Sequence, residues 1–178
     1  MSNPPQPTSA STRVLVAFAT RMGGTEGIAT MIGDELRSRG LQVDVRPAGE
    51  VRDVDPYQVV VLGSALYARR WRRDAVRFLR RHRGALQGRT VRLFQSGPCG
   101  KDAAQPDQPE PAVVRRLRTT IDADPPVTFG GVLDPATARG FVAKRMAQGE
   151  LAGDFRDPAR IRRWAADLAS TCTSAART

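Results

Sequence analysis

The chain has 178 residues, of which 40% are hydrophobic, and a formal net charge of +10 at pH 7. This length fits one domain with a real core, and no apolar run approaches the ~20 residues of a membrane span. One histidine excludes a multi-histidine metal site, and Cys99 and Cys172 fit no metal spacing, so no metal is expected.

Both ends of the chain are polar. Residues 1–12 are rich in proline and serine and have no hydrophobic stretch, which predicts a disordered segment and no signal peptide. A cytoplasmic protein is therefore expected. We place the folded domain at residues 13–169 and a flexible tail at residues 170–178.

The first third of the chain alternates strand and helix patterns. The apolar run that starts at Val14 predicts a buried strand, and it ends in the turn T-R-M-G-G-T. Apolar spacing then predicts a helix over Thr25–Arg39, with Gly40 as its C-terminal cap. The alternating residues Leu41–Arg46 predict a second strand, which Pro47 ends.

The middle of the chain repeats this alternation. The continuous apolar run Gln58–Gly63 predicts a strand buried on both faces, followed by a loop over Ser64–Arg70. Helical spacing predicts a helix over Trp71–Leu86, in which His82 lies on the apolar face and is expected in the core. The many arginines of this helix fit a solvated face, with acidic lipid or RNA as the alternative. Val91–Phe94 predicts the next strand.

The last third is less regular. Ser96–Gly100 and Lys101–Pro111 are expected to be loops, and Ala112–Ile121 a short helix. Val127–Phe129 predicts a strand that runs into residues 130–133. Pro135–Gly149 is ambiguous and partly helical, and Asp157–Leu168 predicts a terminal helix.

Strands that alternate with helices predict an α/β fold, a three-layer sandwich around a five-stranded parallel sheet. Five strands favour the doubly wound order 2-1-3-4-5, in which ligands bind at the switch point beside strand 1. The loops after strands 1, 3 and 4 then meet at one edge of the sheet.

These three loops predict an FMN site. Thr20, Gly23, Gly24 and Thr25 can cradle a phosphate at a helix N-terminus, and Arg21 adds a charge. Tyr67 and Trp71 offer flat surfaces for a ring. Two structural alternatives stay open: a plain Gly-Thr turn at the first loop, and a core anchor for Trp71.

Four segments carry a family resemblance: A-T-R-M-G-G-T-E-G-I-A, V-V-L-G-S-A-L-Y-A-R-R-W, L-F-Q-S-G-P and G-D-F-R-D-P-A-R-I-R-R-W-A. They resemble flavodoxin-domain proteins, in the branch similar to flavodoxin-type, menaquinone-dependent protoporphyrinogen oxidases. The likeness covers about residues 13–169 and implies the flavodoxin-like fold with FMN as cofactor. The chain departs from the usual pattern at Arg21-Met22, which replaces Lys-His or Arg-His, and at Gly24, where relatives more often have serine.

The resemblance assigns cofactor contacts to three groups of residues. The phosphate group is Thr20, Arg21, Met22, Gly23, Gly24 and Thr25; the first ring edge is Ser64, Ala65, Leu66 and Tyr67, with Trp71 beside it; the second ring edge is Ser96, Gly97, Pro98, Cys99 and Gly100. The Cys99 thiol is expected to touch the ring rather than to act in redox chemistry. No catalytic residue is assigned.

The positive charge bears on the reaction. A cationic field stabilises an anionic reduced flavin, which favours an FMN-binding oxidoreductase acting between a reduced planar substrate and a quinone-like or nicotinamide partner. Arg69 and Arg70 are candidates to bind substrate carboxylates, with solvated loop charges as the alternative.

Two further functions stay open on the sequence alone: a one-electron carrier with a redox partner protein, and a flavin-free binding module on the same fold. Peripheral membrane contact is compatible with the basic composition. Nucleic acid is not an expected partner.

Overall fold

The computed structural model describes residues 12–97, 99, 108–133 and 152–175. Its central sheet has five parallel strands in the order β2-β1-β3-β5-β6. Their bounds are β1 (Arg13–Ala19), β2 (Gln42–Pro47), β3 (Val59–Tyr67), β5 (Thr90–Ser96) and β6 (Val127–Phe129). The doubly wound order predicted from the sequence is confirmed, and the numbers differ only because the short strand β4 (Arg70–Trp71) intervenes in the chain.

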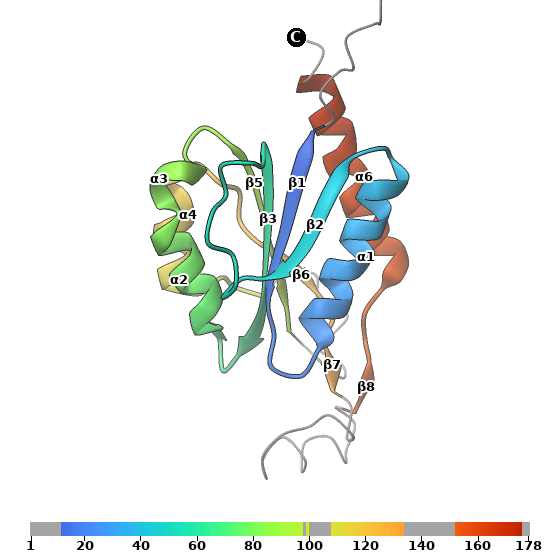
Figure 1. Ribbon diagram of the computed structural model, residues 1–178. Coiled ribbons are helices and arrows are strands. Elements are labelled where there is room, and N and C mark those ends of the chain that lie inside the picture. Colours follow the sequence, from blue (N-terminus) through green and yellow to red (C-terminus); the bar gives the residue numbers. More distant parts are fainter. Residues whose placement is uncertain (1–11, 98, 100–107, 134–151, 176–178) are drawn as a thin grey trace, which may run out of the picture.

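Helices cover both faces of the sheet (Figure 1). On one face lie α2 (Arg73–Arg81), α3 (Arg83–Leu86) and α4 (Ala112–Thr119); on the other lie α1 (Gly24–Ser38) and α6 (Pro158–Ala175). Alternation along β1 shows the division, because Leu15 and Ala17 pack on the α2 side while Val14 and Val16 pack on the α1 side. The three predicted layers are therefore present, with core on both faces.

The end of β3 differs from the prediction of a loop over Ser64–Arg70. The strand continues to Tyr67, turns through Ala68 and Arg69, and returns as β4, with Leu66 opposite Trp71. Ala68 and Arg69 have φ angles of 46° and 59°, which two-residue hairpin turns require. The turn lacks the usual Asn-Gly signal, so the sequence did not reveal the hairpin.

The helices also differ at their ends. The predicted helix over Trp71–Leu86 begins at Arg73 and breaks at His82 into α2 and α3. The terminal helix α6 continues to Ala175, where the sequence suggested a flexible tail from residue 170. In the described ranges, no helix has both the length and the apolar content to cross a membrane.

The chain after β6 forms a separate small sheet. The strands β7 (Val132–Leu133) and β8 (Gly153–Asp154) pair antiparallel beside the carboxyl ends of the main strands (Figure 1). The sequence predicted one strand running from β6 into residues 130–133, but the turn at Gly130 and Gly131 divides it. The predictions for residues 1–11, 100–107 and 135–149 lie outside the described residues.

Candidate functional site

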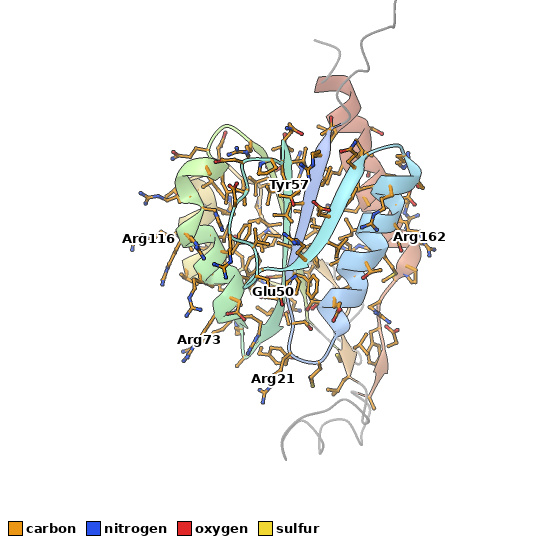
Figure 2. The ribbon with its side chains drawn as sticks, viewed as in Figure 1. Arg21, Glu50, Tyr57, Arg73, Arg116 and Arg162 are labelled. Atoms are coloured by element: carbon orange, nitrogen blue, oxygen red, sulfur yellow. The ribbon has the colours of Figure 1, made fainter. Side chains whose placement is uncertain are left out.

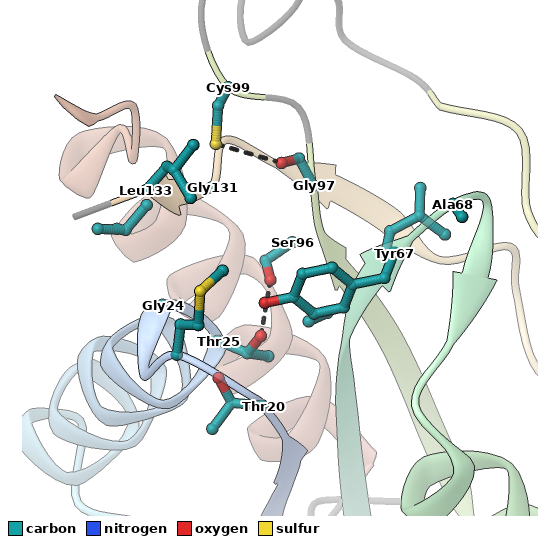
Figure 3. Close-up of a pocket in the computed structure, with 14 residues that line it drawn as sticks. Thr20, Gly24, Thr25, Tyr67, Ala68, Ser96, Gly97, Cys99, Gly131 and Leu133 are labelled. Carbon is teal, nitrogen blue, oxygen red and sulfur yellow. Dashed lines mark hydrogen bonds between the residues drawn. The ribbon is translucent and has the colours of Figure 1, made fainter. Parts of the chain in front are cut away.

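A pocket of about 350 Å³ opens at the carboxyl ends of β1, β3 and β5 (Figure 3). This volume lies within the usual range of ligand pockets, about 300–1,000 Å³. Four segments line it: Thr20, Met22, Gly24 and Thr25; Ala65, Leu66, Tyr67 and Ala68; Ser96, Gly97 and Cys99; and Gly131, Val132 and Leu133. The three predicted loops therefore meet at one site, and a fourth segment joins them.

The turn before α1 has the geometry of an anion cradle. Gly23 takes a left-handed conformation, with φ 81°, and its N–H donates to Thr20 Oγ1 at 3.0 Å. The first N–H groups of α1 have no intrahelical acceptors, and two of the residues that carry them, Gly24 and Thr25, line the pocket. Arg21 is exposed in the same turn and projects from the strand ends (Figure 2).

A buried hydroxyl pair joins the first and third loops. Thr25 Oγ1 and Ser96 Oγ lie 2.7 Å apart, and the two residues are only 1% and 5% exposed. One hydroxyl donates to the other, so a single O–H of the pair stays available to a ligand in the pocket. Thr25 thus positions the third loop as well as facing the proposed phosphate site.

Tyr67 projects its ring into the pocket (Figure 3). Burial raises the pKa of its phenol, while the nearby Arg21 and Arg72 guanidinium groups act in the opposite direction. The phenol therefore stays protonated at neutral pH and offers a ring face and one O–H donor. The two arginines also place positive charge close to this part of the pocket.

Trp71 lies in the core and does not line this pocket. Its side chain is 5% exposed, and Nε1 donates to Gln95 Oε1 at 2.9 Å. The Gln95 amide in turn donates to Thr128 Oγ1 at 3.0 Å. Trp71 is opposite Leu66 in the hairpin, one residue out of step with Tyr67, so the two aromatic side chains leave opposite faces of the ribbon. Of the two interpretations of Trp71 that the sequence left open, the structure therefore supports a core anchor.

Two predicted ring contacts are already engaged within the protein. The Gly97 N–H donates to the Phe129 carbonyl at 3.1 Å, which extends the pairing of β5 with β6. The Ser64 side chain is fully buried, and its Oγ accepts from the Arg72 N–H at 2.9 Å. Ser64 therefore orders the hairpin. Gly97 forms part of the pocket wall, but its N–H is not free to donate to a ligand.

Cys99 is half-buried on the pocket wall. Its Sγ lies 3.7 Å from the Gly97 carbonyl, and burial together with the charge of Asp154 raises the thiol pKa. The thiol is therefore protonated at neutral pH and is a poor nucleophile. Pro98 and Gly100, predicted beside it, lie outside the described residues.

The fourth segment was not predicted as part of the site. A Cβ on Gly131 would lie 2.5 Å from the Gly97 carbonyl oxygen, and one on Gly130 would lie 1.9 Å from the Phe155 carbonyl oxygen. Both glycines therefore permit close backbone approach, which lets Val132 and Leu133 close the pocket. The Gly-Gly pair directly after a predicted strand was the available signal.

An ion pair anchors β8 beside α1. Arg156 Nε donates to Asp154 Oδ1 at 2.8 Å, and this bond lowers the pKa of the Asp154 carboxyl. The guanidinium passes so close to Gly27 that a Cβ there would lie 2.0 Å from Nη1. The described ranges hold no cluster of three or more His, Cys, Asp or Glu side chains suited to a metal ion.

The predicted substrate residues lie outside the pocket wall. Arg69 and Arg70 are exposed at the turn and at the start of β4, where Ala68 is the residue that lines the pocket. Arg70 instead lines an adjoining groove with Tyr67, Trp71, Arg72 and Arg73. The two arginines are thus at the rim of the site rather than within it.

The fold and this pocket define a class, a doubly wound α/β protein with a ligand site at its switch point. The flavodoxin domain model matches residues 15–134, and the chain belongs to this family. The membership indicates FMN as the cofactor. The anion cradle at α1 and the ring face of Tyr67 fit the phosphate and the planar ring of that molecule.

Solved structures share the fold at low sequence identity. An archaeal flavodoxin has a TM-score of 0.63 and 14% identity, over 90% of this chain and 98% of that chain. A Streptococcus pneumoniae flavodoxin has a TM-score of 0.60 and 20% identity, over 90% and 99%. Rubredoxin oxygen:oxidoreductase from Desulfovibrio gigas has a TM-score of 0.61 and 14% identity, over 95% and 37%. No curated protein sequence matches the chain.

Proposed function

We propose that the protein is an FMN-dependent oxidoreductase that passes electron pairs between a reduced planar substrate and a quinone-like or nicotinamide partner. The observation that carries this proposal is the charge around the pocket. No Asp or Glu is among the described residues that line it, and Asp154, whose charge acts on Cys99, is paired with Arg156. Arg21 and Arg72 act electrostatically on Tyr67 inside the pocket. Bound FMN supplies the redox chemistry, and the protein supplies position and field.

Different residues would hold the phosphate and the ring of the cofactor. The N–H groups at the start of α1 and the free O–H of the Thr25–Ser96 pair would hold the phosphate. Tyr67 would contact the ring from the β3 side, and Val132 with Leu133 closes the pocket from the β7 side. Nearby guanidinium groups favour added negative charge on the ring, so they favour reduction by electron pairs.

The competing function is a one-electron carrier. For such a carrier we would expect acidic residues around the pocket. We would load the purified protein with FMN, measure the dissociation constant by fluorescence quenching, and then titrate the complex potentiometrically. A single reduction wave with the Nernst slope of two electrons is expected. Two separated one-electron waves would overturn the electron-pair proposal, and failure to bind FMN would favour a flavin-free module.

The substrate class is tested at the rim. We propose that Arg69 and Arg70, which are exposed at the rim of the pocket, bind the carboxylates of a planar substrate such as a porphyrinogen, with a quinone as electron acceptor. The pair Arg69→Asn and Arg70→Gln keeps the left-handed turn, because asparagine tolerates that conformation. We expect a KM for a dicarboxylate porphyrinogen raised about tenfold, as for a lost charge-assisted contact, with the KM for a neutral quinone unchanged. Equal KM values for the porphyrinogen would remove these residues from substrate binding.

A further inference from the structure

Two grooves continue from the FMN pocket across the α2 side of the molecule. The first, of about 390 Å³, shares Tyr67 with the pocket and is lined by Tyr67, Arg70, Trp71, Arg72 and Arg73. The second, of about 380 Å³, shares Trp71 and Arg73 with the first and is lined by Trp71, Arg73, Val76, Arg77, Arg80 and Val113. We call Arg70, Arg72, Arg73, Arg77 and Arg80 the arginine face.

The arginine face has little internal compensation for its charge. Among the described residues, its one ion pair joins Arg77 to Asp74 at 3.8 Å, and both side chains are at least half exposed. A pair of this kind contributes about 0–1 kcal/mol. In addition, Arg72 Nε is buried without a hydrogen-bond partner in the described part of the chain. A buried donor left unpaired is destabilising, so this surface is not arranged for stability alone.

The start of α2 leads to the same conclusion. Arg72 stands at its N-cap position without a side-chain capping bond, and Arg73 is its first residue. The positive end of the helix dipole repels these two cations, which the single Asp74 in the same turn offsets only in part, and the N-cap position prefers Ser, Thr, Asp or Asn. Figure 2 shows Arg73 pointing outward from this layer, with Arg116 of α4 on the same side of the molecule.

We propose that the arginine face docks an acidic electron-transfer protein, which delivers electrons to FMN through the pocket mouth beside Tyr67. This inference rests on the proposed function. In this reaction the electron-transfer protein takes the place of the reduced planar substrate as donor. Two molecules of reduced partner each lose one electron, FMN gains the pair, and solvent supplies the accompanying protons. The pair then passes to the electron acceptor.

A protein fits this surface better than a membrane does. The face extends over β4, α2 and the edge of α4, and arginine is enriched in protein interfaces. The apolar residues of the second groove, Val76 and Val113, are partly buried against the core and cannot insert into lipid. Complementary charge would steer an acidic partner and speed its association at low salt.

The test compares two charge reversals with the same change in net charge. The docking variant carries Arg73→Glu and Arg80→Glu; the control carries Arg162→Glu and Arg163→Glu on α6, whose Arg162 lies across the sheet from Arg73 (Figure 2). The probe is a reduced acidic ferredoxin, mixed with the FMN-loaded protein in stopped flow. We expect the second-order rate constant to fall about tenfold or more in the docking variant and about twofold or less in the control.

The measurement separates failure of docking from failure of the proposed function. Reduction of each variant by dithionite and its FMN dissociation constant should match the parent. Equal losses in both variants, or rates that do not fall with added salt, would overturn the docking surface while leaving the FMN function intact. If FMN does not bind, calorimetric titration of the apoprotein with oxidised ferredoxin still tests docking. Binding to phosphatidylglycerol vesicles that the docking variant alone loses, without any ferredoxin effect, would overturn it in favour of a membrane.

Discussion

Helices α1 and α2 lie on opposite faces of the sheet. Helix α1 follows β1, and α2 follows the hairpin of β3 and β4, so both begin near the pocket at the carboxyl ends of the strands. Helix α1 begins with glycine and threonine, carries Glu26 in its first turn, and pairs Arg37 with Asp34 at 2.9 Å near its end. Helix α2 begins with Arg73 and has four arginines in nine residues. The first helix follows the charge preferences of a helix dipole at both ends, whereas the second has arginine at its N-cap and first positions, followed by Asp74 in the same turn.

The difference separates two kinds of functional surface. We propose that the start of α1 faces the FMN phosphate, where exposed N–H groups and the helix dipole both favour an anion. The start of α2 lies beside the pocket, where Arg72 and Arg73 outnumber the single carboxylate of Asp74. Arginine at positions that disfavour cations is thus the more informative signal of an acidic partner.

The largest effect is expected between the two helices, at Gly63 in β3. A Cβ there would lie 1.9 Å from Phe94 Cζ, so Gly63→Ala must displace a fully buried ring. Overpacking of this kind is destabilising by about 2–3 kcal/mol, measured by urea denaturation. Gly84→Ala is the control, since its Cβ meets nothing within 4 Å. Similar losses in both variants would contradict the packing argument.

The next effect sharpens the role of the α1 start. We propose that Ser96 donates to Thr25 Oγ1, so that the Thr25 O–H is the one that donates to the phosphate; Thr25→Val keeps the shape of the side chain but removes this donor. Hydrogen bonds to charged groups contribute about 1.5–3 kcal/mol, so FMN affinity should fall about 10- to 100-fold in a fluorescence titration. Thr30→Val, on the exposed side of α1, should leave the affinity unchanged. An unchanged dissociation constant in Thr25→Val would remove this hydroxyl from the phosphate site.

A smaller effect tests whether α2 begins against its dipole. Arg73→Glu should stabilise the free protein by about 0.5–1 kcal/mol, because it exchanges a repelled cation for an attracted anion. Arg80→Glu, near the end of the same helix, should have the opposite sign. Chemical denaturation at low salt measures both. Destabilisation by Arg73→Glu would mean that Arg73 has a structural role.

The smallest effect concerns His82, at the end of α2. Burial lowers the pKa of its imidazole below the ordinary value, and Nε2 is buried without a hydrogen-bond partner among the described residues. The unfolded chain therefore binds a proton at a higher pH than the folded protein does. Stability should fall as the pH drops below about 6.5, and level off below the lowered pKa. In His82→Leu this decline in the denaturation midpoint should be absent, and its persistence would assign it to other groups.

Apolar periodicity predicted most of the strands, because parallel strands buried on both faces leave continuous hydrophobic runs. Their order was predicted from the doubly wound arrangement that five strands alternating with helices favour. Apolar periodicity failed at two elements whose formation does not depend on apolar spacing. The β3–β4 hairpin turns on Ala68 and Arg69, which rarely adopt positive φ, and β7 pairs with a strand about 20 residues away in the sequence. Neither event leaves a local pattern.

The candidate site was predicted to a similar degree. The three loops were identified because small residues after buried strands accumulate at one edge of a doubly wound sheet. The contributions of Gly131, Val132 and Leu133 depend on close backbone contacts between distant segments, and the sequence does not encode these contacts locally. Gly97 is an example, because only the pairing with β6 shows that its N–H donates to the Phe129 carbonyl.

By itself, the sequence determined the alternation of elements, the Gly-Thr turn at Thr20–Thr25 and the excess of positive charge, since these are properties of spacing and composition. Tertiary structure decided which side chains share a surface. Because the hairpin is pleated, the side chains of Tyr67 and Trp71 leave its opposite faces, so Tyr67 lies in the pocket and Trp71 in the core. Packing of α2 beside β4 then gathered scattered arginines into one face that begins at the pocket mouth, because grooves form only where elements meet.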